Sequence, residues 1–105
     1  MTYSKKMKAL VNTSPKTLGV QLMLWAVEKD LSITRISEVT GATRQTVYNW
    51  ARGGKVATRY MPKVKQLLYV LHEIKSTESE EVWSQVREQL IQEPSPTESL
   101  SNTSQ

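Results

Sequence analysis

Apolar residues recur at spacings of three and four positions from residue 14 to residue 92. This spacing places apolar side chains on one face of a helix, and it predicts a compact all-α domain of five helices. The segment 93–105 is polar and interrupted by prolines, which predicts a disordered tail. The segment 1–13 is either a flexible basic arm or a short helix with its apolar residues, Tyr3, Met7 and Leu10, on one side.

The first predicted helix is unusually apolar. We expect it to begin at Ser14-Pro15, because serine caps helices and proline suits the first helical position, and to run to about Lys29. It has two apolar stripes, one with Leu18, Leu22 and Trp25 and the other with Val20, Met23, Leu24 and Val27. A helix that is apolar on nearly all sides is normally buried on both faces. The second stripe therefore needs a cover: the C-terminal helix, a second subunit or both.

Two short helical patterns follow, joined at Gly41. The first begins after Ser32, a good N-cap, and turns Ile33 and Ile36 inward. Gly41 tolerates the positive φ that a sharp turn requires. Thr43 is expected to cap the second pattern.

The second pattern, residues 44–52, has Val47 and Trp50 as its inner positions. Four polar or aromatic side chains are then left facing outward: Arg44, Gln45, Tyr48 and Asn49. Arginine, glutamine and asparagine carry the paired donors and acceptors that suit guanine and adenine edges.

Two more helices complete the predicted domain. Pro62 opens a core helix with an apolar stripe of Val64, Leu67, Leu68, Leu71 and Ile74, beside which His72 is expected to be a partly buried structural residue. Thr77 and Glu80 have the spacing of a capping box for a helix over 78–92. This last helix is either a lid on the core or a dimerisation element.

Charge is distributed unevenly along the chain. The net charge is +4, but residues 35–65 hold seven lysines and arginines against Glu38 alone, whereas residues 66–105 hold seven glutamates against two basic residues. Residues 1–16 add four lysines and no acid. A basic block that coincides with the two short helices is what a polyanion-binding face requires.

Composition argues against several other functions. The chain has no cysteine and one histidine, so disulfides, thiolate metal sites and a catalytic triad are excluded. We predict no enzyme activity, no catalytic residue, no metal and no cofactor. The longest apolar stretch is too short to span a bilayer, and no signal-peptide core is visible, so we expect a cytoplasmic, nucleoid-associated protein without a membrane partner.

Residues 18–71 resemble the lambda-repressor-like helix-turn-helix family, which includes phage repressors, Cro proteins and XRE-type regulators. The matching features are Leu31-Ser32, Ile36, Gly41, the run from Thr43 to Val47, Trp50 and Gly53. The resemblance places a helix-turn-helix at 32–52 within a DNA-binding domain at 14–92. It implies that the helix 44–52 enters the major groove of double-stranded DNA.

Carried over position by position, the resemblance implies base contacts from Arg44, Gln45, Tyr48 and Asn49. Phosphate contacts are expected from a second set: Ser32, Thr43, Thr46, Arg52, Lys55 and Arg59. One recognition helix reads few base pairs, so we also expect a homodimer or higher oligomer that binds an operator as a transcriptional regulator.

The chain departs from the family pattern at three places. Ile33 replaces a glutamine that contacts phosphate, and Ser37 replaces a small residue that is usually alanine. Ala26 and Ala51 stand where many members have an arginine–glutamate pair. Because both charges are lost together, neither is left unpaired in a buried site. This predicts an apolar contact, without an ion pair, between the first helix and the end of the helix 44–52.

A thinner resemblance links the short chain, the Met61-Pro62-Lys63 helix start and the helical C-terminal part to phage lysogeny activators. It indicates an origin in a phage or another mobile element and adds RNA polymerase as a candidate partner. The alternative is a protein-interaction module, such as a phage-type inhibitor or adaptor of host machinery that retains the helix-turn-helix fold.

Overall fold

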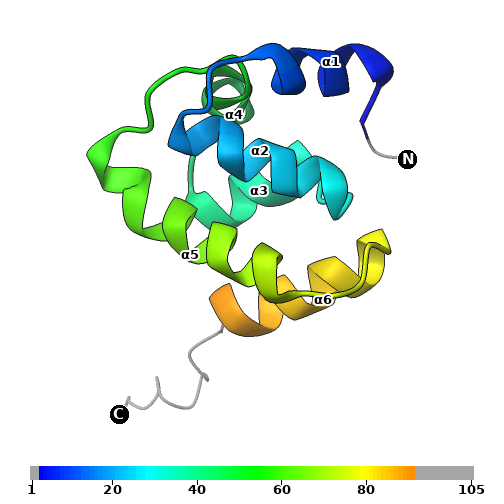
Figure 1. The fold of residues 1–105 in the computed structure, drawn as a ribbon. Helices are drawn as coiled ribbons and strands as arrows, with labels where there is room; N and C mark the ends of the chain where they lie inside the picture. Colours follow the sequence, from blue (N-terminus) through cyan, green and yellow to red (C-terminus); the bar gives the residue numbers. More distant parts are fainter. Residues whose placement is uncertain (1–2, 92–105) are drawn as a thin grey trace.

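A computed structural model of the protein describes residues 3–91, and within them it contains only helices and loops (Figure 1). In chain order the elements are α1 (Lys5–Thr13), α2 (Leu18–Glu28), α3 (Ile33–Thr40), α4 (Arg44–Ala51), the 3-10 turn η1 (Thr58–Tyr60), α5 (Met61–Glu73) and α6 (Ser79–Leu90). The predicted all-α class is confirmed. The predicted disordered tail, 93–105, lies outside the described residues.

The N-terminal segment forms a helix, so residues 3–91 contain six α-helices where five were predicted. Helix α1 begins because the Ser4 hydroxyl accepts a hydrogen bond from the Met7 amide, at 3.1 Å. Tyr3 and Val11 are buried, which ties the helix to the core. Of the two alternatives for residues 1–13, the described part is therefore the short helix.

The prediction that α2 begins at Ser14-Pro15 was wrong. Ser14 is the C-cap of α1, and its hydroxyl donates to the Leu10 carbonyl at 2.7 Å. The N-cap of α2 is Thr17, whose hydroxyl accepts from the Val20 amide at 3.3 Å. A serine followed by proline suits the end of one helix as well as the start of the next, and here the preceding helix decided between them.

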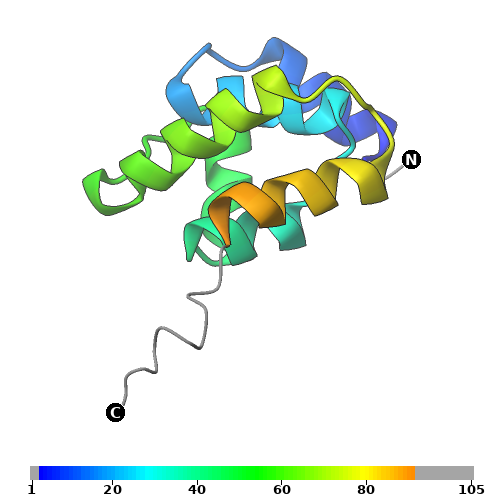
Figure 2. The same ribbon diagram turned by 90° about the horizontal axis from the view of Figure 1, so that it is seen from below.

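The second apolar stripe of α2 is only partly covered within the chain, since Leu24 and Val27 are partly buried. Helix α2 packs against α1, α4 and α5, and Val20 and Met23 are completely buried. Helix α6 packs instead against α5 and α3 (Figure 2). Its Val82 and Val86 are completely buried there, so α6 is a lid on the core.

The predicted capping box at the start of α6 was also wrong. The N-cap is Glu78, whose side chain makes no capping hydrogen bond, and its amide donates instead to the Ser76 hydroxyl at 3.0 Å. The prediction that His72 is partly buried was wrong as well, because its side chain is exposed. Its ring meets the edge of Trp25, with the ring centroids 5.1 Å apart, and its Nδ1 lies 3.5 Å from the Glu73 carboxylate.

The turn between α2 and α3 joins distant parts of the chain. Asp30 has a positive φ of 58°, and the Ser79 hydroxyl donates to its carbonyl at 2.9 Å. Lys29 is buried, and its Nζ donates to the carbonyl of Ile74 at the end of α5. The start of α6 and the end of α5 are thereby fixed to the turn from which α3 begins.

Within residues 3–91, no helix has the length and hydrophobicity needed to cross a bilayer.

Helices α2 and α4 cross in close contact at Gly19. A Cβ atom built on Gly19 would lie 2.7 Å from the Trp50 Cβ and 3.1 Å from the Trp50 Cα. The first distance is shorter than real Cβ contacts and the second is tighter than most, and the Trp50 backbone cannot rotate away as a flexible side chain can. The absence of a side chain at position 19 therefore sets the separation of the two helices.

We predict that Gly19→Ala destabilises the protein by about 1–3 kcal/mol in urea unfolding, because α4 must move away from α2. This loss exceeds the gain in helix propensity, which is about 1 kcal/mol for alanine over glycine. Gly41→Asn is the control: Gly41 has no neighbour within 4 Å of a built Cβ, and asparagine tolerates its φ of 82°. A Gly19→Ala variant as stable as the wild type would contradict the close crossing.

Candidate nucleic-acid interface

Helix α4 buries one face and exposes the other as the sequence predicted. Val47 and Trp50 are 0% and 1% exposed. The four residues predicted to read bases all lie on the exposed face of the helix: Arg44, Gln45, Tyr48 and Asn49. The exposed face therefore combines a cation, two amides and a phenol on a rigidly packed helix.

Caps at both ends of the preceding turn fix the direction of α4. Gly41 is the C-cap of α3 in the left-handed conformation, with φ of 82°, and its amide donates to the Ser37 carbonyl at 2.9 Å. The Thr43 hydroxyl then accepts from the Thr46 amide at 3.1 Å and caps α4. The predicted roles of Gly41 and Thr43 in the fold are confirmed. The hydroxyl of Ser37 donates to the carbonyl of Ala42, which adds a further restraint across the turn.

Two contacts hold the C-terminal half of α4. The rings of Trp50 and Tyr60 meet edge to face, with centroids 5.8 Å apart. Ala26 and Ala51 are both completely buried where α2 meets α4. Neither alanine brings a charge into the core.

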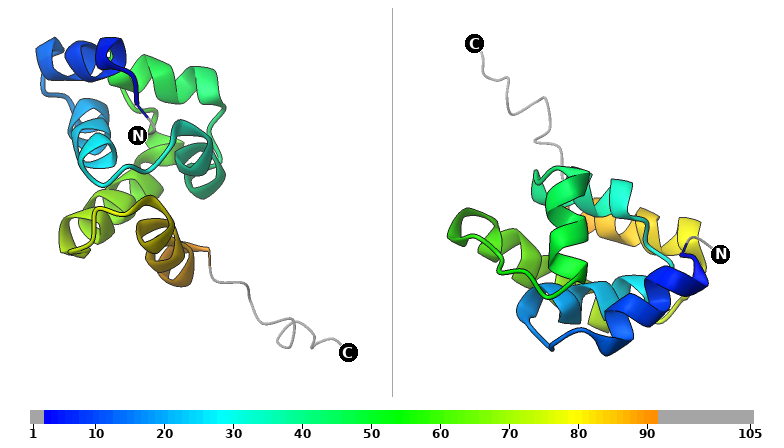
Figure 3. Two further views of the ribbon diagram at one scale, coloured as in Figure 1. Left: turned by 90° about the vertical axis from the view of Figure 1, so that its right-hand side faces the viewer. Right: turned by 90° about the horizontal axis from the view of Figure 1, so that it is seen from above.

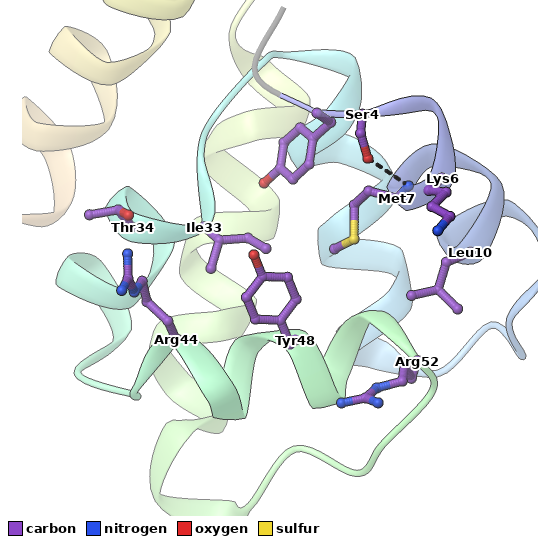
Figure 4. A pocket seen from close by; sticks show the side chains of 10 residues that line it. Ser4, Lys6, Met7, Leu10, Ile33, Thr34, Arg44, Tyr48 and Arg52 are labelled. Atoms are coloured by element: carbon purple, nitrogen blue, oxygen red, sulfur yellow. Dashed lines mark hydrogen bonds between the residues drawn. The ribbon is translucent and has the colours of Figure 1, made fainter.

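A groove of about 720 Å³ separates α4 from α1 (Figure 4). Its floor is largely apolar and its rim polar; the lining residues are Tyr3, Ser4, Lys6, Met7, Leu10, Ile33, Thr34, Arg44, Tyr48 and Arg52. Figure 3 shows α1 and α4 together at one end of the molecule, with α6 at the opposite end. The groove therefore adjoins the exposed face of α4.

The groove divides the exposed side chains of α4 into two stripes. Arg44, Tyr48 and Arg52 recur every four residues and line the groove, whereas Gln45 and Asn49 do not. Figure 4 shows Tyr48 between the two arginines, pointing toward Ile33. Lys6 adds a third positive charge from α1, and among residues 3–91 no acidic residue lines the groove.

Arg52 and Asn49 connect the two stripes. The Arg52 Nη2 donates to the Asn49 Oδ1 at 3.1 Å. A guanidinium has no acceptor, so the amide oxygen must be the atom that faces it, and the Asn49 NH₂ group is left to point elsewhere. Arg52 thus orients the amide of Asn49 while keeping other N–H donors for a ligand.

The remaining predicted phosphate contacts lie in different places. Ser32 is half-buried at the N-cap of α3, with its hydroxyl accepting from the Arg35 amide at 3.2 Å, and the hydroxyl of Thr46 accepts from that of Thr43 at 3.0 Å. Lys55 and Arg59 are exposed on the connection from α4 to α5, outside the groove lining.

One member of the basic block is diverted from this surface. The guanidinium of Arg35 bonds to the Glu80 carboxylate at 3.0 Å and lies 5.1 Å from the centroid of the Trp83 ring. Arg35 thus holds α3 to α6, and one of the seven positive charges of residues 35–65 has a structural role.

The predictions from sequence did not include the α1 side of the groove. Tyr3, Met7 and Leu10 share one side of α1, as expected for a short helix in this segment, and they line the groove. The signal that could have revealed this wall is the capping residue: Ser4 stands directly before the lysines, in the position that an N-cap requires. Recognising this cap would have placed Lys6 on a helix.

No protein-family model matches the chain, and neither a curated protein nor a solved structure is significantly similar to it. Within residues 3–91, no group of three or more histidine, cysteine, aspartate or glutamate side chains is placed to hold a metal ion.

A buried hydrogen bond anchors the start of α1 and hence one wall of the groove. The Tyr3 hydroxyl donates to the Leu31 carbonyl at 2.6 Å. Burial raises the pKa of Tyr3 well above its ordinary value, and the nearby Asp30 carboxylate raises it further. Both effects disfavour the phenolate, so the neutral hydroxyl is kept as a donor.

We predict that Tyr3→Phe costs about 1–3 kcal/mol at neutral pH, because it leaves the Leu31 carbonyl buried without this donor. The pKa of Tyr3 is higher in the folded protein than in the unfolded chain, where it is about 10. Its contribution to the free energy of unfolding is therefore complete below about pH 10 and is lost as the pH rises above that value. The advantage of the wild type should therefore be constant from pH 7 to about pH 9 and shrink above about pH 10 in urea titrations. Tyr69→Phe, at an exposed position, is the control and should change stability by less than about 0.5 kcal/mol.

Proposed function

We propose that this protein is a sequence-specific double-stranded DNA-binding regulator in which residues 32–52 act as a lambda-repressor-like helix-turn-helix. The observation that carries the proposal is the exposure of Arg44, Gln45, Tyr48 and Asn49 on α4, over the buried Val47 and Trp50. A helix held by two large buried side chains offers its outward groups in a fixed arrangement. Such rigidity is what direct reading of base edges requires.

The chemistry of the exposed face favours DNA over a protein partner. Exposed cations border it, since Lys6 and Arg52 line the groove beside α4, and a protein that neutralises phosphates gains affinity by releasing counterions. Gln45 offers a donor and an acceptor to adenine, and Arg44 offers two parallel donors to guanine. Asn49 presents its NH₂ outward because its oxygen already accepts from Arg52, so a base acceptor such as guanine O6 or thymine O4 is its natural partner.

Dimerisation remains part of this proposal, but not through the apolar side of α6, which is used as a lid. A more suitable surface lies on α2 and α5. Tyr69 is 67% exposed there, and Trp25 and Leu68 are only partly buried. Two copies joined at a twofold axis would read two half-sites about 34–36 Å apart, which gives a useful length of operator.

Selection from random duplex DNA with the purified protein tests the proposal. We expect the wild type to enrich a palindromic motif at moderate salt. Gln45→Ala and Arg44→Ala should each relax the motif at a single base position per half-site, at a cost of about 1–3 kcal/mol. Binding to the enriched duplex, followed by fluorescence anisotropy, measures these losses.

Lys55→Ala is the matched control for a backbone contact. It should weaken binding to the enriched and scrambled duplexes alike and reduce the slope of log K against log salt by about one. If the wild type enriches no motif while a protein partner is captured in a pull-down, the DNA proposal is wrong and the interaction-module alternative gains support.

A further inference from the structure

We propose that the groove between α1 and α4 holds the sugar–phosphate backbone of one DNA strand, with Lys6 and Arg52 contacting phosphates from opposite walls. This inference rests on the proposed function and extends it to a helix outside the region of family resemblance. The observation behind it is that both side chains line one groove that has no acidic lining residue.

The dimensions of an α-helix and of the major groove explain why a strand should lie there. A helix with its side chains is about 10–12 Å across, and the major groove of B-DNA is about 12 Å wide. A helix inserted into the groove therefore presents its leading edge to the bases and its flanks to the two backbones. With Gln45 and Asn49 on the leading edge, the stripe that contains Tyr48 and Arg52 faces the strand on the α1 side.

The length of the groove matches a linear polyanion better than a compact anion. Arg44 and Arg52 mark its two ends along α4 and are eight residues apart, which is about 12 Å along a helix. One strand of B-DNA carries a phosphate at every nucleotide, so a groove open over this distance faces more than one phosphate. Arg52 at one end and Lys6 on the opposite wall can each meet a phosphate of such a strand, while Arg44 at the other end is left for a base edge.

The groove also offers neutral donors and apolar surface to a backbone. The hydroxyls of Ser4, Thr34 and Tyr48 belong to its lining, and such groups commonly donate to phosphate oxygens. The floor contains Met7, Leu10 and Ile33, which suit the less polar faces of deoxyribose.

The test compares Lys6→Ala with Lys16→Ala on the full-length chain. Lys6 is exposed and lines the groove, whereas Lys16 is exposed outside it, where its Nζ donates to the carbonyls of Asn12 and Ser14. Both variants remove one positive charge at an exposed position. Anisotropy titrations use the motif selected by the wild type and a scrambled duplex, each over a series of salt concentrations.

We expect Lys6→Ala to lower affinity several-fold for both duplexes and to reduce the salt slope by about one, and Arg52→Ala to reduce the slope by the same amount. Lys16→Ala should leave both quantities at their wild-type values. Duplexes with one neutral methylphosphonate per strand locate the contact. At one backbone position, replacing the phosphate by methylphosphonate should lower the affinity of the wild type for the duplex. The same replacement should cause no further loss of affinity for Lys6→Ala.

Several results would overturn the inference. If Lys6→Ala behaves as Lys16→Ala while the wild type still selects its motif, the groove holds no strand, although the proposed function stands. Tighter binding by Lys6→Ala would mean that α1 obstructs the DNA. A change in the sedimentation coefficient of the free protein, without a change in DNA affinity, would assign the groove to a second copy of the chain. If the wild type selects no motif, the proposed function fails and this inference fails with it.

Discussion

The close crossing of α2 and α4 at Gly19 and Trp50 is the contact on which the candidate interface depends. Trp50 is the largest fully buried side chain, and its backbone approaches α2 so closely that no Cβ fits at position 19. Because α4 has only eight residues, it has little intrinsic helical stability and takes its position from packing. With Val47 and Trp50 buried, the exposed residues on the other face have no freedom to turn inward.

A second set of contacts builds the surroundings of α4 from the turn between α2 and α3. The hydroxyls of Tyr3 and Ser79 donate to the carbonyls of Leu31 and Asp30, so the start of α1 and the start of α6 are attached to adjacent residues of this turn. Helix α1 is thereby placed beside α4, and α6 on the far side of the core (Figure 3). The groove exists because of this attachment, since α1 alone is too short to hold its position.

Charge and packing act together on the cationic surface. Arg35 belongs to the basic block in sequence, but its bond to Glu80 and its position over Trp83 commit it to the contact between α3 and α6. Arg52 remains exposed and both orients Asn49 and borders the groove. A cation can therefore serve the fold or the surface, and its neighbours in space decide which.

The sequence by itself determined the features that depend on neighbouring residues. The caps at Ser32 and Thr43, the left-handed Gly41 and the inward direction of Val47 and Trp50 follow from local hydrogen bonding and helical periodicity. Only the tertiary structure decided whether Ser14 ends one helix or begins another, which helix covers α2 and where Lys6 lies relative to Arg52. These outcomes depend on contacts between residues distant in the chain, such as Tyr3 with Leu31, and a short-range pattern contains no information about them.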